Sequence, residues 1–210
     1  DQFPAPFDTK NLNFGNMKKI SLLKRSRAGV FWDVINPKVS WDFLTGIYLS
    51  IFKTKKWLKS IDIIDQEKIK DTRVWSNFDN TCAHIKIYAN AFKNSRAYFY
   101  EGALTVNSLG IREWVPLYPF IEIIRLPECL DYYRSRGMSF KKYVLNKNYA
   151  LRNFFNYFFK IIINGKKAGL NYVNFRKHFF TNLIYPNAWL SIIYFIVRKF
   201  KLTIKFQKEI

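Results

Sequence analysis

The chain has 210 residues, of which 49% are hydrophobic, and its formal net charge is +20. This length is enough for one or two domains with a substantial core. The two cysteines, Cys82 and Cys129, lack the paired spacing of a metal motif. They argue against a disulfide scaffold and a zinc site, and they suit a reducing compartment.

The positive charge is concentrated in the last third of the chain. Residues 134–210 contain sixteen Lys and Arg and a single acid, Glu209, which gives this region a net charge of +15. The same region is rich in rings, five of which fall within residues 154–159. Basic charge combined with many rings indicates a surface that contacts an anionic membrane.

The hydropathy pattern predicts that the chain does not span a membrane and leaves binding to a membrane surface open. The longest nearly apolar stretch, residues 188–197, is about half of the ~20 residues that a spanning helix needs. Residues 1–7 are rich in proline and contain no apolar run, so no signal peptide is predicted.

The first half of the chain predicts a loop followed by short strands and helices. We expect a loop over residues 1–20, a short apolar strand or turn over 28–35, a strand over 48–52 and a short helix within 57–70. Apolar residues at helical spacing predict a helix over 81–92, with its N-cap at Asp79, Asn80 or Thr81.

Next, residues 96–106 predict two short strands around Glu101 and Gly102. Three prolines are expected to divide residues 111–130 into short elements. From Ser139 onward the pattern is helical, and the tail over 201–210 is expected to be a frayed end or an edge strand. The predicted fold class is therefore mixed α/β (α+β as a fragment), with a mostly helical C-terminal region.

Complete catalytic motifs are missing from the sequence. It contains no Gly-rich phosphate loop, HExxH, GxSxG or DxD motif. Asp79 lies at a predicted loop-to-helix junction, where the helix dipole favours the ionised carboxylate that a general base needs. The same position equally suits an N-cap. His84, one turn into the helix, fits either a catalytic role or a core histidine.

Several short motifs together resemble a known family. They are Gly46 to Ser50 followed by Trp57, the Ala83-His84-Ile85 helix, and Arg96 to Tyr100 leading to Ala103 to Asn107. Over roughly residues 40–115, this order resembles the C-terminal half of family 2 glycosyltransferases, especially the abequosyltransferase-like branch. The resemblance implies the C-terminal half of a GT-A fold and transfer of a sugar from a nucleotide sugar to a surface-polysaccharide or lipid-linked glycan.

The sequence departs from this family in its first half. The family's nucleotide-binding motifs and its D-x-D metal motif are missing, and the chain begins at Asp1, not Met. This start fits a chain that begins partway through such an enzyme and is inactive alone. We expect no cofactor in this part and Mg²⁺ or Mn²⁺ in the full-length enzyme.

The resemblance also implies roles for individual residues. Asp79 would be the base that deprotonates the acceptor hydroxyl, and His84 would lie near the diphosphate or the acceptor. The predicted acceptor-binding residues are Trp75, Asn107, Arg112 and Trp114. Arg112 can bind a phosphate or carboxylate with its forked donors, and Trp114 can stack on a sugar ring. A solvated charge and ordinary core packing are the alternatives for these two.

The predicted organisation has two parts. Residues 1–130 would form the acceptor-side half of the transferase domain, and residues 131–210 a basic, membrane-associating helical region. Its predicted membrane-binding residues are Lys166, Lys167, Arg198 and Lys199. The expected location is the cytoplasmic face of the cell membrane, with a nucleotide sugar, a glycan acceptor and anionic lipid as partners.

Two other functions are compatible with the composition. Net charge and interleaved rings also suit a nucleic-acid-binding protein. No RNP, KH, helix-turn-helix or zinc-finger pattern is present, and the basic residues are diluted among large apolar faces, so no nucleic-acid partner is expected. The second alternative is a membrane adaptor without catalytic activity.

Overall fold

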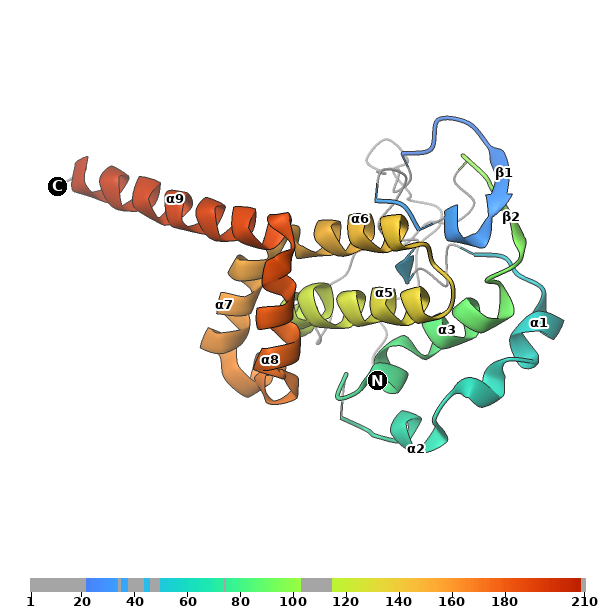
Figure 1. Cartoon of the computed structure of the whole chain (residues 1–210). Coiled ribbons are helices and arrows are strands. Elements are labelled where there is room, and N and C mark those ends of the chain that lie inside the picture. The colour runs from blue at the N-terminus through green and yellow to red at the C-terminus, as the bar shows by residue number, and fades with distance from the viewer. Residues whose placement is uncertain are drawn as a thin grey trace, which may run out of the picture.

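The structure is a computed structural model, and it describes residues 22–33, 35–37, 44–45, 50–73, 75–102 and 115–208, with side chains described as far as Arg198. These residues are mostly helical and include one small antiparallel sheet (Figure 1). A mixed α/β class therefore agrees with the structure, with helices far outnumbering strands. Asn107, Arg112 and Trp114 lie outside the described residues, as do the loop predicted over 1–20 and the second strand predicted after Gly102.

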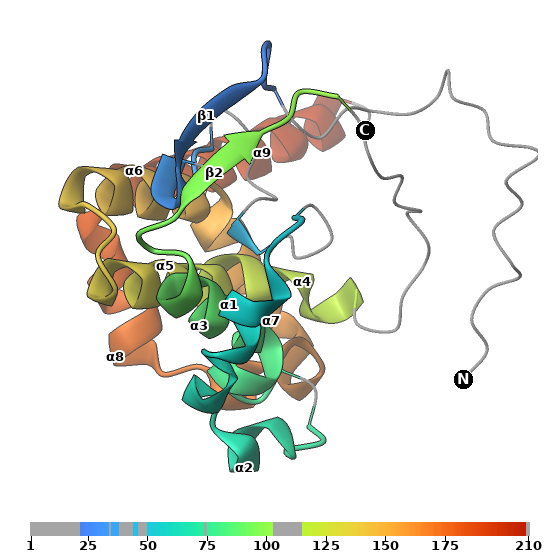
Figure 2. The ribbon, with the colours of Figure 1, turned by 90° about the vertical axis from the view of Figure 1, so that its right-hand side faces the viewer.

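The sheet pairs β1 (Arg27–Val30) with β2 (Arg96–Phe99). Its register places Arg27 opposite Phe99 and Val30 opposite Arg96, so segments nearly 70 residues apart lie side by side at one edge of the molecule (Figure 2). A single 3₁₀ turn, η3 (Phe31–Asp33), follows β1. The strand predicted over 48–52 is wrong for residues 50–52, which have no regular structure; residues 48–49 lie outside the description.

The first core is built on α3 (Phe78–Ala91). Short elements precede this helix: α1 (Thr54–Leu58), η6 (Ile61–Ile63) and α2 (Gln66–Ile69). The helix packs on α5 (Leu126–Ser135), which in turn packs on α6 (Phe140–Ala150). The buried centre contains Ile85, Cys129, Leu130 and Tyr133, all at most 1% exposed.

The three prolines of residues 115–130 lie among short helical elements, as the sequence predicted. The chain turns continuously through η7 (Val115–Leu117), α4 (Tyr118–Phe120), the π-helical turn η8 (Ile121–Arg125) and α5. Pro119 and Pro127 lie in the first turns of α4 and α5. Proline is tolerated in the first turn of a helix because its nitrogen has no carbonyl partner to lose there.

The second core joins the C-terminal helices to η8. It is formed with η9 (Leu151–Asn153), α7 (Phe154–Asn164), η10 (Gly165–Ala168), η11 (Leu170–Tyr172), α8 (Phe175–His178), η12 (Phe180–Ile184) and α9 (Pro186–Lys208). From α7 it takes Phe154, Phe158 and Ile161, which recur at helical spacing and are at most 3% exposed.

Helix α9 extends well beyond the rest of the molecule (Figure 1). The expectation of a frayed end or strand after residue 200 is wrong, since α9 continues to Lys208. The tail alternates apolar and polar residues, and its lysines Lys201, Lys205 and Lys208 also recur at helical spacing in the sequence. The helical period therefore prevails over the strand period here.

Candidate functional site

The N-terminus of α3 is closed by a pair of asparagines. Asn77 is the N-cap: its side chain accepts from the backbone N–H of Asn80 at 3.0 Å. The side-chain oxygen of Asn80 accepts the backbone N–H of Asn77 in return. The predicted N-caps at Asp79, Asn80 and Thr81 are therefore wrong by two or more residues. The reciprocal pair satisfies two backbone amides at once.

Asp79 turns away from the helix end and into the protein. Its residue is 1% exposed, and the Lys86 ammonium lies 2.5 Å from its Oδ1. Lys86 follows seven residues later on the same face of α3, and its ammonium lies 6.0 Å from the centre of the Tyr132 ring on α5. A buried carboxylate is tolerated only with such a partner. This pairing favours a structural role for Asp79.

His84 contacts different residues, Thr45 and Tyr88. Its Nε2 donates to the backbone carbonyl of Thr45 at 2.9 Å, and its ring meets Tyr88 edge to face. Burial lowers the pKa of His84, and the hydrogen bond to Thr45 offsets this only in part. The imidazole is therefore neutral at pH 7, which suits a donor held by a carbonyl.

Asp79 and His84 have separate partners. The backbone is non-helical at Cys82, between them, where φ is −131° and ψ is 32°. Within the described part of the chain, Asp79 contacts Lys86 and His84 contacts Thr45, and no hydrogen bond joins the two side chains. The predicted catalytic pair therefore lies on one helix without forming a dyad.

Trp75 has the backbone geometry of a constrained turn. Its φ of +57° is unusual for a bulky residue, and its carbonyl accepts from Nη2 of Arg125 at 2.8 Å. The indole packs against the second core. Of the four predicted acceptor-binding residues, Trp75 is therefore the one that the structure describes, and it is half-buried.

Glu128 on α5 has three partners that the sequence analysis did not find, two cationic side chains and one histidine. Arg125 Nη1 lies 2.5 Å from Oε2, Lys177 Nζ lies 2.6 Å from Oε1, and His178 Nε2 lies 3.3 Å from Oε1. Burial alone would raise the pKa of Glu128, but its partners lower it to about 2. The i, i+3 pair with Arg125 was the available signal; the contribution from α8 depends on tertiary packing.

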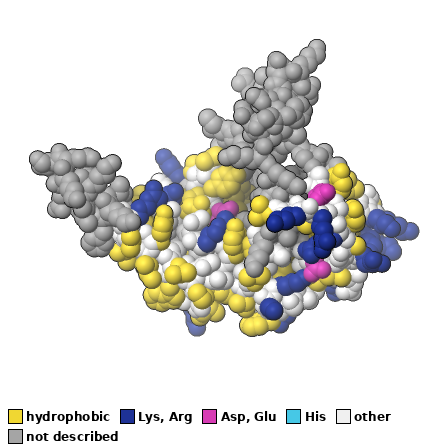
Figure 3. Space-filling view, turned by 90° about the horizontal axis from the view of Figure 1, so that it is seen from above, with side chains coloured by type: hydrophobic (Ala, Val, Ile, Leu, Met, Phe, Trp, Pro, Cys, Tyr) yellow, Lys and Arg dark blue, Asp and Glu magenta, His cyan; other side chains and the backbone are white. Residues whose placement is uncertain are grey.

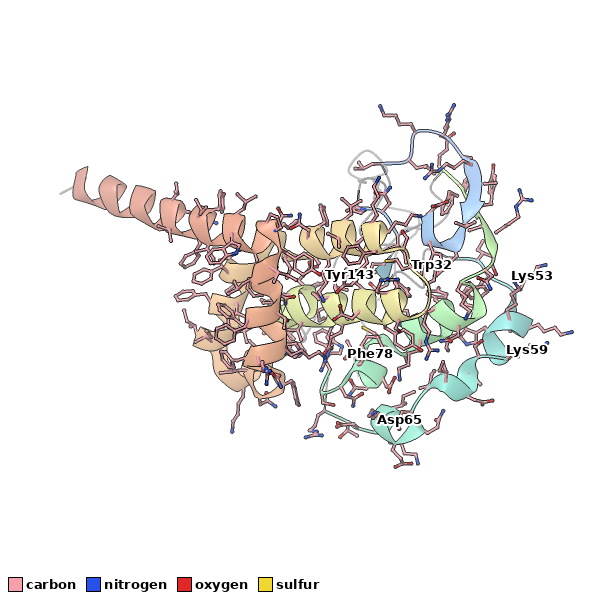
Figure 4. All side chains as sticks on the ribbon, in the orientation of Figure 1. Trp32, Lys53, Lys59, Asp65, Phe78 and Tyr143 are labelled. Atoms are coloured by element: carbon pink, nitrogen blue, oxygen red, sulfur yellow. The ribbon has the colours of Figure 1, made fainter. Side chains whose placement is uncertain are left out.

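A second polar network lies between α5, α6 and the start of α9. Asp131 accepts from the Tyr143 hydroxyl at 2.8 Å and pairs with the ammonium of Lys147. Tyr185 donates to the Tyr143 oxygen at 3.3 Å. Figure 4 shows Tyr143 between the helices, whereas Lys53, Lys59 and Asp65 lie at the outer edge. Burial and the adjacent Asp131 raise the pKa of Tyr143. Because Tyr143 packs against the first core and Tyr185 belongs to the second, this network links the two cores.

Metal-binding clusters are absent from the part of the chain that the structure describes. No group of three His, Cys, Asp or Glu side chains there is arranged to hold an ion.

The helical end of the molecule presents a large apolar surface to solvent. We call it the apolar end, and it consists of the exposed side chains Phe159, Ile162, Ile163, Phe180, Ile184, Trp189, Leu190, Ile193, Tyr194, Ile196 and Val197. Seen from above, hydrophobic side chains gather around the base of the projecting α9, with basic side chains beside them (Figure 3). Such a patch is far more apolar than a water-facing surface requires.

The predicted membrane-binding residues lie at two sides of the apolar end. Lys166 and Lys167 are exposed on η10, directly after α7, and Arg198 is exposed on α9; the Lys199 side chain lies outside the described set. Among the described residues, no single helix is long and apolar enough to cross a membrane. The segments Phe175–Ile184 and Pro186–Arg198, bent by 96°, reach the length and composition of a span when taken together.

Comparisons with known proteins return no match: no protein-family model, no curated protein and no solved structure is similar to this chain.

Proposed function

We propose that this chain docks on an anionic membrane surface through the apolar end and serves as the acceptor-side part of a glycosyltransferase acting there. The observation that supports docking most strongly is the solvent-facing side of α9. The transferase activity and the GT-A-like fold are supported by the sequence resemblance over residues 40–115. The two parts of the proposal are therefore tested separately.

Helix α9 is apolar over most of its circumference. Ala188, Ser191 and Phe195 face the body of the protein, and the opposite arc carries six apolar side chains that are 45% to 69% exposed: Trp189, Leu190, Ile193, Tyr194, Ile196 and Val197. At 100° per residue these six cover about 160° of the helix. A helix with such a face is stable when that face is covered.

The charge around this face matches an anionic bilayer. Residues 165–208 contain nine Lys and Arg and no acid. Each basic residue near an anionic surface contributes about 1 kcal/mol, so Lys166, Lys167 and Arg198 together support appreciable binding. Buried rings add to this attraction, and neither contribution requires a spanning helix.

Docking is tested by sedimentation with vesicles. The wild-type chain should pellet with phosphatidylglycerol vesicles and pellet less as salt is raised, because screening weakens exposed charges. Reversal of Lys166, Lys167, Arg198 and Lys199 to Glu should release it. Pelleting that the reversal does not change, or no pelleting of the wild type, would contradict docking; salt-sensitive binding to single-stranded oligonucleotides in place of vesicles would favour the nucleic-acid alternative.

Transfer is tested on the full-length enzyme that the resemblance implies, in membranes supplied with a panel of nucleotide sugars. Release of nucleoside diphosphate above membranes lacking the protein supports the proposal, and no release with any donor contradicts it. If Asp79 were the base, Asp79→Asn would slow transfer about 10²-fold or more. The buried pair with Lys86 instead predicts a rate near that of wild type.

A further inference from the structure

A groove runs between η9 and the first turns of α9. It is shallow and open to solvent, has a volume of about 420 Å³ and has two different ends. Arg152, Asn187 and Ser191 form the polar end, and Leu190, Ile193, Tyr194 and Val197 form an apolar wall. A cationic end followed by an apolar strip matches an amphiphile with a negative head and a hydrocarbon tail.

The Arg152 guanidinium is held in place at the polar end. Its Nη1 donates to the carbonyl of Tyr149 at 3.1 Å, and its Cζ lies 4.3 Å from the centre of the Tyr149 ring. The carboxylate of Glu122 lies 3.8 Å away, at the edge of ion-pair distance. These contacts orient a group whose forked donors suit phosphate oxygens.

The apolar wall and a second arginine lie further along α9. Residues 187, 191, 194 and 198 follow one another at three- and four-residue spacing, so they share one helix face. Arg198 therefore lies one turn beyond Tyr194, at the distal side of the groove, and it is exposed. The two arginines flank the apolar wall, and charge complementarity favours an anionic occupant.

From this arrangement we infer that the groove binds a single anionic phospholipid, with the headgroup phosphate on Arg152 and an acyl chain along Leu190, Ile193, Tyr194 and Val197. This inference rests on the proposed docking, because the groove opens on the same apolar side of α9. It adds a defined lipid site to an otherwise general attraction between basic residues and the bilayer.

The test uses a lipid that is soluble as a monomer. Dihexanoyl phosphatidylglycerol, kept below its micelle concentration, should bind the wild-type chain saturably in a ³¹P NMR titration. Arg152→Gln should weaken this binding by about tenfold or more, the expected loss when a charged hydrogen bond to phosphate is removed. Lys160→Gln is the matched control, since Lys160 is an exposed cation on α7 outside the groove.

A second variant probes the apolar wall, and inorganic phosphate serves as a probe that has the phosphate group but no acyl chain. Leu190 is 58% exposed, so Leu190→Ser should keep the fold. It should weaken binding of the lipid and leave binding of inorganic phosphate unchanged. Inorganic phosphate should bind far more weakly than the lipid. Three results would contradict the lipid site: equal affinity for phosphate and lipid, no saturable lipid binding, or equal losses of lipid binding in Arg152→Gln and Lys160→Gln. Vesicle pelleting of the same wild-type sample separates the outcomes: pelleting without monomer binding leaves docking intact and rejects only the lipid site.

Discussion

At the scale of single residues, the sequence correctly indicated that the N-terminus of α3 is special but misplaced its cap. Asp, Asn and Thr are all good N-caps, so residue type alone could not select Asn77. Asp79 does not cap the helix because its carboxylate pairs with Lys86, seven residues further along the chain, inside the protein. His84 was left with two roles, and its contact with Thr45 across 39 residues could not be predicted from local spacing.

The Asp79–Lys86 pair should matter for stability. Lys86→Met leaves a carboxylate that is 2% exposed without its partner, so we expect the free energy of unfolding to fall by about 3 kcal/mol. The double variant Asp79→Asn with Lys86→Met should recover much of this loss. Urea unfolding measures both, with Lys70→Met as the control, because the Lys70–Glu67 pair is 69% and 81% exposed. An equal, small effect in both single variants would contradict a buried pair.

Glu128 should make stability depend on pH in the acid range. Its ordinary pKa of 4.5 is lowered to about 2 in the folded chain, so the unfolded state binds the proton first as the pH falls. Stability is therefore fully present above about pH 4.5 and is lost as the pH approaches 2, by on the order of 3 kcal/mol. Glu128→Gln should flatten this part of the profile in urea unfolding at several pH values. A profile as steep as that of wild type would refute the assignment.

At the scale of elements, helices with a regular hydrophobic period could be predicted from the sequence, whereas the type of the short elements between them could not. The helix predicted over 81–92 is present as α3, and the helical region after 139 is present as α6 to α9. The prolines of residues 115–130 correctly indicated short elements, but the π-turn between α4 and α5 has no local sequence signature. The sequence of residues 201–208 fits both a helix and a strand, and these residues are helical because they continue α9.

Adjacent phenylalanines on α7 separate packing from docking. Phe158 is 3% exposed and Phe159 is 37% exposed. We expect Phe158→Ala to lower the free energy of unfolding by about 3 kcal/mol, since it leaves a cavity in the second core. Phe159→Ala, which loses a ring contact with Phe195, should lower stability less than Phe158→Ala does and should reduce pelleting with phosphatidylglycerol vesicles. If Phe159→Ala pellets as wild type does, α7 takes no part in docking.

At the scale of the whole molecule, the charge asymmetry was readable from the sequence and its arrangement in space was not. The +15 of residues 134–210 indicated a basic, ring-rich region. The two cores and the projection of α9 follow from contacts between distant segments, such as the pairing of Glu128 with Lys177. The candidate acceptor site was predictable only as isolated residues, three of which lie outside the described part of the chain.

The most direct test of docking measures the membrane depth of one position on α9. Both native cysteines are buried, at 3% and 0% exposure, so a cysteine introduced at Ile193 takes up a nitroxide spin label selectively. On phosphatidylglycerol vesicles, we expect the label at 193 to become accessible to oxygen and shielded from a water-soluble nickel chelate. A label at Ile69 on α2, far from α9 in Figure 1, should remain accessible to the chelate. If the label at 193 stays equally accessible to the chelate with and without vesicles, the apolar end does not enter the membrane and the central proposal is wrong.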